Sequence, residues 1–464
     1  MTSTKGRRDN QNMSGQIQTV AEDLAAILLR PVNADARARA RRHLLDWTAC
    51  AVAGAVEPGT AQVRDLSALE GTGPCRVVGG ARAGPQAAAL ANGPAGAILE
   101  MDDVDKRGLL HPGPVVLPAA LATAEACGQL SGDAFLDAVV RGYEAMIRVG
   151  RAAGPDHYRY FHATGTCGGF GAAGAAASLL GLSQSQLTSA LGNAGQQAAG
   201  LWQVRHEPVF TKALHNGRAA ANGLAAAFLA KSGYAGPRGV FEGPQGFFAA
   251  LCGTADPWAV VTEPQADWAI HQVSFKAHAA CRHAHAAIDA VLDLRARAGS
   301  TSLVLLEIAS YRDALTFCDQ PSPETPAEAK FSLQHAAAVA WQFGEAGLSR
   351  FASQAITDPA TARLRHQVTV AESPEITARY PARFGATARA TLETGEVLLA
   401  EAPDALGDPE RPVSEAVLLA KARALMVWGG MSAGATEVLI AAVQGLGETT
   451  DVAAFSAALP GTDL

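Results

Sequence analysis

The sequence has few charged and few aromatic residues: Asp, Glu, Lys and Arg make up 17% of its 464 residues, and Phe, Trp and Tyr make up 6%. The formal net charge of -7 gives no reason to expect a nucleic acid or an anionic membrane as a partner. Apolar runs are broken by charges before they reach the length of a membrane span. With 48% hydrophobic residues, the chain is expected to form a globular protein.

Cysteines are also scarce, and their arrangement excludes a disulfide framework. There are seven, an odd number, and no two of them form a CxxC pair. Scattered thiols of this kind are typical of reduced, cytoplasmic proteins. Residues 1–16 are polar and lack the apolar stretch of a signal peptide, so we expect a disordered tail and a cytoplasmic location.

Several common catalytic motifs are missing. The sequence contains no P-loop, no GxSxG elbow and no HExxH, and no glycine fingerprint follows a predicted strand. The glycine-rich stretch TGTCGGFGAAG, from Thr164 to Gly174, leads into an alanine-rich helix. Close helix packing explains these glycines better than phosphate binding does.

Helical periodicity dominates the first two thirds of the chain, with many Ala and Gly positions that allow helices to pack closely. Near residue 300 the pattern changes. Strands are predicted in SLVLLEIASY, QVTVAES and ARATLETGEVLLAEA, with a hairpin turn at Thr394-Gly395. We therefore predict a mainly α fold, with a large all-helical domain from both chain ends (17–269 and 406–464) and a smaller α+β lid domain (270–405).

Four segments place ionisable residues beside Gly or Pro, just before or after an apolar helix. They are EMDDVDKRGLLHPGPVV, FHATGTCGGFG, FTKALHNGRAAANG and SFKAHAACRH. Together with LLDWTACAVAGA, LLGLSQSQLTSALGNAGQQAAG, EGPQGFFAAL and AKFSLQHAAAVA, in this order along the chain, they resemble the 2-methylcitrate dehydratase family, also called MmgE/PrpD. Its known members include 2-methylcitrate dehydratases, cis-aconitate decarboxylases and an iminodisuccinate epimerase.

The resemblance implies a homodimer with its active site between the two domains, and no metal or organic cofactor. Position by position, it assigns catalytic roles to His111, His162, Lys212 and Lys276. It assigns substrate binding to the acidic positions Glu100, Asp102 and Asp103, and to Cys281 and Arg282. The first acidic position holds Glu where the family usually has Asp.

Family members act on small di- or tricarboxylates and make or break a C–H bond next to a carboxylate. Removing that proton adds charge to an anion, so the site must supply cations and hydrogen-bond donors, together with a base of suitable pKa. Two lysines, an arginine and several histidines meet both needs. Asp105, Lys106 and Arg107 are expected in a solvated loop, and a lysine in an open cavity is expected to add little stability.

These residues leave other interpretations open. His278, Cys281 and His285 have the spacing HxxCxxxH, which fits three metal ligands on one helix face, but Lys276 and Arg282 would repel a divalent cation. His283 and His285 are expected to begin a structural helix. The leading function is a cofactor-independent lyase, a dehydratase or decarboxylase, with a small anionic polycarboxylate as substrate. The alternatives are a dicarboxylate epimerase and an inactive carboxylate-binding homologue.

Overall fold

The computed structural model describes residues 18–207 and 209–462. The predicted tail at residues 1–16 lies outside the described residues. Helices make up 59% of the protein, and the sheet has four strands, so the predicted mainly α fold with a small α+β part is confirmed. The seven cysteines are all free thiols, as predicted. Among the described helices, none has the length and apolarity required to cross a bilayer.

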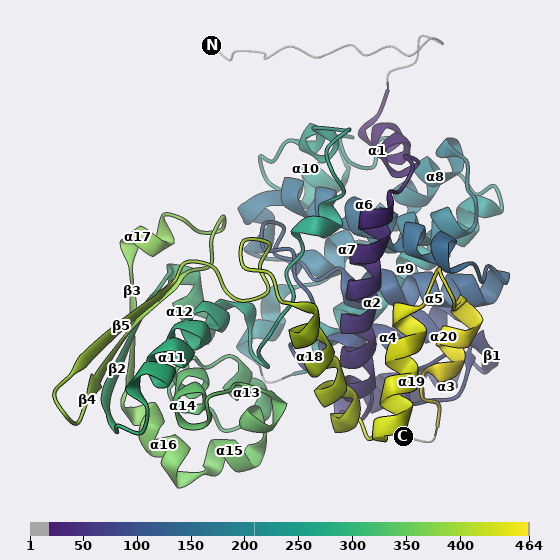
Figure 1. The fold of residues 1–464 in the computed structure, drawn as a ribbon. Helices are drawn as coiled ribbons and strands as arrows, with labels where there is room; N and C mark the ends of the chain where they lie inside the picture. The colour runs from purple at the N-terminus through teal and green to yellow at the C-terminus, as the bar shows by residue number, and fades with distance from the viewer. Residues whose placement is uncertain (1–17, 208, 463–464) are drawn as a thin grey trace, which may run out of the picture.

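The first part of the chain forms a helical body, on the right of Figure 1. Its longest helix, α6, is interrupted at Gly154, where φ is 75°. A short strand, β1 (Thr72–Cys75), follows the third helix. The helices of this part are α1 (Val20–Leu28), α2 (Ala34–Ala55), α3 (Pro58–Ala68), α4 (Pro85–Ala97), α5 (Gly113–Cys127), α6 (Gly132–Tyr158), α7 (Ala163–Leu179), α8 (Gln184–Gly195), α9 (Thr211–Lys231) and α10 (Phe247–Leu251).

Glycines bring α6, α7 and α9 into close contact at the centre of this body. A Cβ atom on Gly223 would lie 2.3 Å from the Gly169 carbonyl oxygen, and one on Gly171 would lie 2.8 Å from that of Gly142. No side chain fits at these distances, so glycine is required. The glycine-rich stretch therefore packs helices, as predicted.

The second part contains the sheet. Its strands are β2 (Leu303–Ser310), β3 (Val368–Glu372), β4 (Ala386–Leu392) and β5 (Val397–Ala402), in the order β3-β2-β4-β5. β2 pairs with β3 in parallel and with β4 in antiparallel register. β4 and β5 form the predicted hairpin, and Gly395 in its turn has a φ of 84°. All three predicted strand segments are thus confirmed.

Helices cover one face of this sheet, with α11 against β4 and β5 and α14 against β3 (Figure 1). The helices of this part are α11 (His285–Ala298), α12 (Arg312–Cys318), α13 (Pro326–Lys330), α14 (Leu333–Phe343), α15 (Ser353–Thr357), α16 (Pro359–His366) and α17 (Pro374–Thr377).

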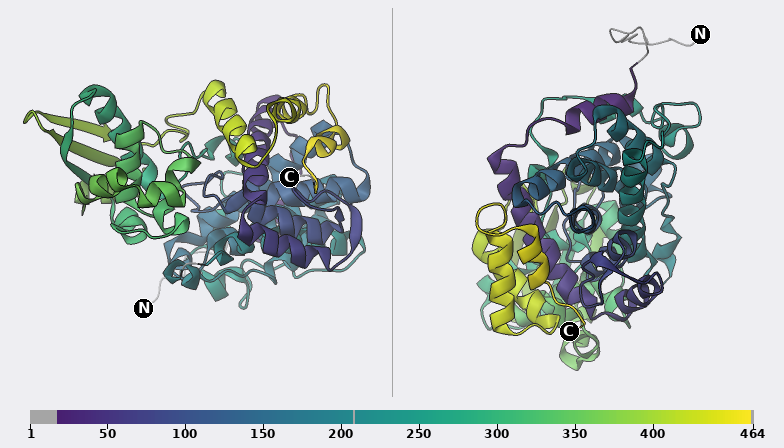
Figure 2. Two further views of the ribbon diagram at one scale, coloured as in Figure 1. Left: turned by 90° about the horizontal axis from the view of Figure 1, so that it is seen from below. Right: turned by 90° about the vertical axis from the view of Figure 1, so that its right-hand side faces the viewer.

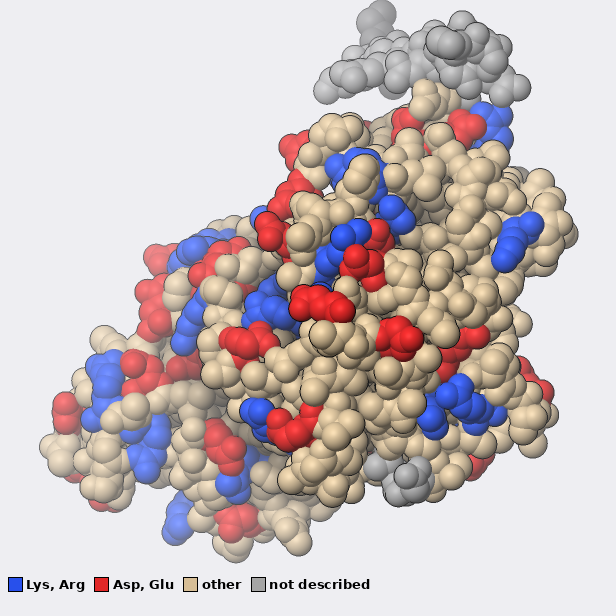
Figure 3. Space-filling view, turned by 45° about the vertical axis from the view of Figure 1, so that its right-hand side comes forward, with Lys and Arg blue, Asp and Glu red and all other residues tan. Residues whose placement is uncertain are grey.

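The chain then returns to the helical body with α18 (Glu415–Trp428), α19 (Ala433–Gln444) and α20 (Val452–Ala458). Both α18 and α19 pack on α2, and α20 packs on α5 (Figures 1 and 2). Both ends of the chain thus contribute to one body, while the boundaries at 269/270 and 405/406 remain predictions. On the face shown in Figure 3, acidic and basic side chains are interspersed.

Candidate active site

The acidic segment between α4 and α5 is held next to the segment that carries Lys276. Val104 and Ser274 exchange two backbone hydrogen bonds, of 3.0 and 2.8 Å. Glu100 has a φ of 57°, in the left-handed region that a non-glycine residue rarely adopts. Such strain persists only where surrounding contacts enforce it, and it is common at functional sites. The local fold thus places acidic side chains beside a lysine that is distant in sequence.

Two lysines and two carboxylates form one continuous cluster. Lys212 pairs with Glu100, and the ammonium of Lys276 lies 3.2 Å from both Glu100 Oε2 and Asp102 Oδ1. Burial alone would raise the pKa of both carboxyl groups. The neighbouring cations outweigh it, holding the pKa of Glu100 far below its ordinary value and that of Asp102 at about 2. The pKa of Lys276 is raised because the carboxylates overcome its burial. Glu100, Asp102 and Lys276 are therefore charged at neutral pH.

His111 extends the cluster at the start of α5. Its Nδ1 lies 2.9 Å from Asp102 Oδ2 and 2.9 Å from the Asp103 carbonyl oxygen, so this nitrogen carries a proton. Its backbone N–H donates to Thr164 Oγ1 at 3.0 Å. Because Thr164 lies in the first turn of α7, this bond ties His111 to the element that carries His162. The two imidazole centroids are 6.3 Å apart.

His162 is a buried, neutral imidazole that precedes α7. Its Nδ1 lies 3.1 Å from Nδ1 of His215, and its ring packs on Trp202 with centroids 4.6 Å apart. Burial, followed by the charge of Lys212, lowers the pKa of His162 well below its ordinary value. Its Nε2 is buried with no hydrogen-bond partner among the described residues. Since buried nitrogens are normally paired, this atom is a candidate to bind or move a substrate proton.

The structure thus brings six of the predicted residues into one connected arrangement: Glu100, Asp102, His111, His162, Lys212 and Lys276. They come from the acidic segment, from the residues directly before α5 and α7, from the first turn of α9, and from the segment before α11. Their catalytic and binding roles remain proposals.

Asp103 has different partners, which hold the acidic segment in place. One of its oxygens accepts from Gly113 N at 2.8 Å, and the other from the Tyr143 hydroxyl at 2.7 Å, with His43 Nδ1 also at 2.7 Å. Burial raises the pKa of Asp103 to about 6. Both oxygens are therefore bound by the protein and neither contacts the two lysines, and the predicted role of Asp103 in substrate binding remains a proposal.

Arg282 also points elsewhere. It pairs with Asp408, whose Oδ1 additionally accepts from Ser274 Oγ at 2.5 Å. Cys281 is buried and lies near the cluster. The adjacent Cys318 thiol donates to Cys281 and, although burial opposes it, holds the pKa of Cys281 below its ordinary value. Of the two predicted cations in SFKAHAACRH, Lys276 therefore joins the cluster and Arg282 does not.

The expected solvated loop at Asp105, Lys106 and Arg107 is wrong for its first two residues. Asp105 is fully buried and pairs with Arg151, and Lys106 is 2% exposed. The ammonium of Lys106 lies 2.7 Å from Glu410, 3.7 Å from Asp404 and 3.8 Å from Asp408. The reason is non-local: these three carboxylates follow more than 290 residues later in the chain and surround the lysine.

The HxxCxxxH arrangement does not converge as a ligand set. His278 Nε2 lies 2.8 Å from Asp289, and His285 Nε2 lies 3.1 Å from the Ala280 carbonyl oxygen. Within the described residues, only Asp404, Asp408 and Glu410 group closely enough to suggest a cation site. Three cations of the protein, Lys106, Arg282 and Arg383, already pair with that group. As predicted, His283 and His285 begin a helical segment, with His283 donating to or accepting from the Tyr311 hydroxyl at 2.7 Å.

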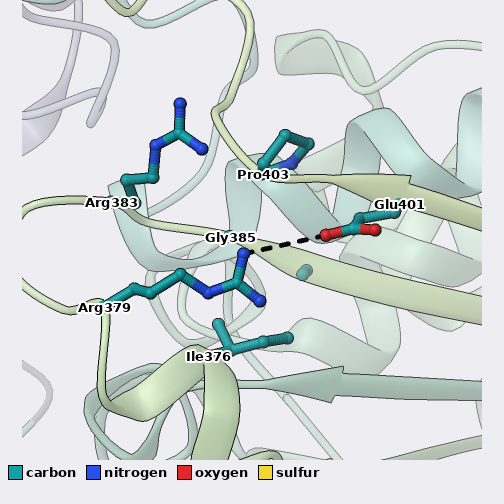
Figure 4. A pocket seen from close by; sticks show the side chains of 7 residues that line it. Ile376, Arg379, Arg383, Gly385, Glu401 and Pro403 are labelled. Atoms are coloured by element: carbon teal, nitrogen blue, oxygen red, sulfur yellow. Dashed lines mark ion pairs between the residues drawn. The ribbon is translucent and has the colours of Figure 1, made fainter.

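A small pocket in the α+β part is lined by none of the predicted site residues (Figure 4). It is lined by Arg379, Arg383 and Glu401, among others. Arg379 lies 3.9 Å from Glu401, and Arg383 lies 3.1 Å from Asp404. Because both guanidinium groups already face carboxylates, this pocket offers no free cation to an anionic ligand.

No role was assigned to His215 from the sequence, although its spacing from Lys212 could have indicated one. It follows Lys212 by three residues on α9, so the two side chains share one helix face. Its pKa is lowered by burial and by Lys212. With both imidazoles neutral, one Nδ1 of the His162–His215 pair donates and the other accepts.

Comparison with known proteins identifies the class of protein that this fold and cluster define. The MmgE/PrpD N-terminal domain matches residues 18–259, and the MmgE/PrpD C-terminal domain matches residues 278–444. The chain belongs to the MmgE/PrpD family, as its sequence resemblance predicted.

Its relatives include several cis-aconitate decarboxylases. The cis-aconitate decarboxylase-like protein oryM of Aspergillus oryzae is 35% identical over 281 residues, covering 57% of this chain and 58% of the relative. The cis-aconitate decarboxylase of Aspergillus terreus is 31% identical over 309 residues, covering 63% of each chain. The human cis-aconitate decarboxylase is 27% identical over 393 residues, covering 81% of this chain and 80% of the relative. The matches thus span less than two thirds of the two fungal proteins.

Proposed function

We propose that this protein is a cofactor-independent lyase that acts on a small di- or tricarboxylate by proton transfer at a carbon next to a carboxylate. The observation that supports the proposal most is the unpaired Nε2 of the neutral His162 near the cluster that holds the ammonium groups of Lys212 and Lys276. A proton-transfer group and fixed positive charge are the two things this chemistry requires. The similarity to cis-aconitate decarboxylases makes cis-aconitate the first substrate to test.

In a decarboxylation, one carboxylate leaves as CO₂, and its bonding electrons pass to the adjacent carbon framework. That carbon framework then takes up one proton and forms a new C–H bond. The substrate thus loses CO₂ and gains one hydrogen. Lys276 stays an ammonium and stabilises the negative charge that develops. His162 and His111 are the candidates to deliver the proton. In a dehydration the same groups would remove a proton from carbon and help hydroxide leave as water.

The experiment is proton NMR of the protein in D₂O with a panel of di- and tricarboxylates that begins with cis-aconitate. A decarboxylase gives a product with one carboxylate fewer and deuterium at the newly formed C–H position. A dehydratase gives an alkene from a hydroxy acid. Inversion without loss of any group would instead establish the epimerase. A folded protein that changes none of these compounds, yet binds them, would be the inactive homologue.

Two further features of the proposal have simple tests. We expect full activity after treatment with EDTA, and activity that is lost on chelation and restored by zinc would contradict a cofactor-independent mechanism. We also propose a homodimer, on the family resemblance alone, and sedimentation velocity would report twice the 47.7 kDa chain mass. The cytoplasmic location remains a prediction.

A further inference from the structure

Lys330 is a cation near the candidate site whose ammonium has no ion pair and no hydrogen bond with any residue of 18–207 or 209–462. It is the last residue of α13 and is partly buried. A partly buried ammonium that has no carboxylate partner favours the binding of an anion beside it.

Two contacts fix this end of α13 beside the cluster. Cys281 N donates to the Lys330 carbonyl oxygen at 2.8 Å, which joins the helix end to the segment that carries Lys276. The next residue, Phe331, places its ring 5.6 Å from the ammonium of Lys212. The backbone of Lys330 is therefore held from two sides by residues at the cluster.

Two of the three charges that act most on the Lys330 ammonium, those of Glu100 and Lys276, belong to the candidate site, and the third is that of Glu57, directly before α3. Burial lowers its pKa most, while Glu57 and Glu100 raise it and Lys276 lowers it. Neither carboxylate approaches within ion-pair distance of Lys330. The ammonium thus lies in the electric field of the cluster without being neutralised by a direct contact.

The other cations nearby are already engaged. Lys212 and Lys276 share the carboxylates of Glu100 and Asp102, and Arg282 pairs with Asp408. Arg205 is exposed, and its guanidinium stacks over Phe317 at 4.5 Å. A substrate with several carboxylates therefore finds at Lys330 a positive charge that the protein itself has left unpaired.

We propose that Lys330 binds a second carboxylate of the substrate, away from the reacting carbon, and so favours ligands that carry this carboxylate over ligands that lack it. This inference rests on the proposed function, because it assumes that the cluster is the substrate site. Lys330 would act through binding and orientation, whereas Lys276 and His162 would meet the charge and the proton of the reaction.

The test is calorimetric binding of tricarballylate, a saturated and unreactive tricarboxylate, compared with glutarate and methylsuccinate. Glutarate lacks the central carboxylate of tricarballylate, and methylsuccinate lacks one of its terminal carboxylates. We expect the wild-type protein to bind tricarballylate about tenfold or more tightly than at least one truncated ligand. In Lys330→Met that preference should fall to about threefold or less. KM for the true substrate should rise about tenfold while kcat changes little, because the contact is made equally in the ground and transition states.

Lys330→Arg keeps the charge and should retain most of the preference, and Lys231→Met, an exposed lysine at the end of α9, should behave like wild type. If Lys330→Met does not fold, Lys330→Gln serves in its place. A wild-type protein that binds none of the three anions would overturn the proposed function itself. A wild-type preference that persists unchanged in Lys330→Met would overturn only the role of Lys330.

Discussion

The ammonium of Lys276 lies 3.2 Å from the carboxylate of Asp102, and both side chains are buried. Ser274, two residues before the lysine, pairs with Val104, two residues after the aspartate, so the backbone itself fixes the ion pair. The second carboxylate at Lys276, that of Glu100, also binds Lys212. This arrangement makes Lys276 part of the structure as well as of the proposed chemistry.

Lys276→Met is expected to reduce both activity and stability. Without the ammonium, developing charge on the substrate loses its main partner, which should lower kcat/KM roughly 10²-fold or more. The same change leaves two buried carboxylates short of one cation, at a cost of about 3–5 kcal/mol in the free energy of unfolding. The second effect differs from the expectation for a lysine in an open cavity. Urea denaturation and steady-state kinetics measure the two effects.

The matched control is Lys231→Met, which removes an exposed lysine and should change neither quantity. Kinetics should be measured at a temperature where the Lys276 variant is fully folded. If Lys276→Met retains wild-type kcat/KM on the true substrate, then Lys276 does not meet the reacting charge.

Replacing His215 should impair His162 without any loss of substrate binding. His215→Leu removes the Nδ1 partner of His162, so the ring loses its fixed tautomer and orientation. We expect kcat to fall roughly tenfold or more, with KM nearly unchanged. His215→Asn places an amide near the original Nδ1 and should restore much of the rate. Equal activity of the leucine and asparagine variants would argue against hydrogen-bond control of His162.

Lys106→Met is expected to lower the stability of the protein while leaving its kcat/KM nearly unchanged. Lys106 is buried, and its ammonium lies beside the carboxylates of Asp404, Asp408 and Glu410 rather than in the ion pairs of Glu100 and Asp102. Its removal should lower the free energy of unfolding by about 3–5 kcal/mol, because buried carboxylates lose their common cation. The kcat/KM of the folded variant should stay within a few-fold of wild type. A large loss of kcat/KM in a stable Lys106→Met protein would place this cluster in the mechanism.

The sequence predicts those features of the structure that depend on neighbouring residues, and it does not predict contacts between residues that are distant in sequence. The strands followed from β-branched runs, and the hairpin turn from Thr394-Gly395, because neighbouring residues determine both. The four polar segments could be predicted to meet only through the family resemblance. The partners of Arg282 and Lys106 could not, since Asp408 lies far from both in sequence and its approach depends on tertiary packing. The number of cations available to a substrate was therefore overestimated from the sequence, because the carboxylate that pairs with Arg282 could not be foreseen.

Stability should fall as the pH decreases from 7 to 5. Burial lowers the folded-state pKa of seven histidines: His43, His157, His162, His215, His283, His285 and His335. In the unfolded chain they bind protons near pH 6.5. The stability that they contribute is thus present above pH 6.5 and is lost as the pH falls below it, by about 1.4 kcal/mol per pH unit for each net proton.

Two buried carboxyl groups with raised pKa values act in the opposite direction. Burial raises the pKa of Asp46 and Asp103 to about 6, so these two groups favour folding as the pH falls from 6 toward 4. Because the seven histidines outnumber these two carboxyl groups, the net change should be destabilising. Urea denaturation at pH 7.0 and 5.0 measures the difference. A protein that is more stable at pH 5.0 would show that the carboxyl groups dominate.

The most direct test of the central claim is a crystal structure of the protein with tricarballylate bound. The account predicts the ligand near His162 Nε2, with one carboxylate at hydrogen-bond distance from Lys276 or Lys212 and another at Lys330. Tricarballylate that binds in solution but occupies another place in the crystal, with the cluster of Glu100, Asp102 and the two lysines unchanged and empty, would contradict it.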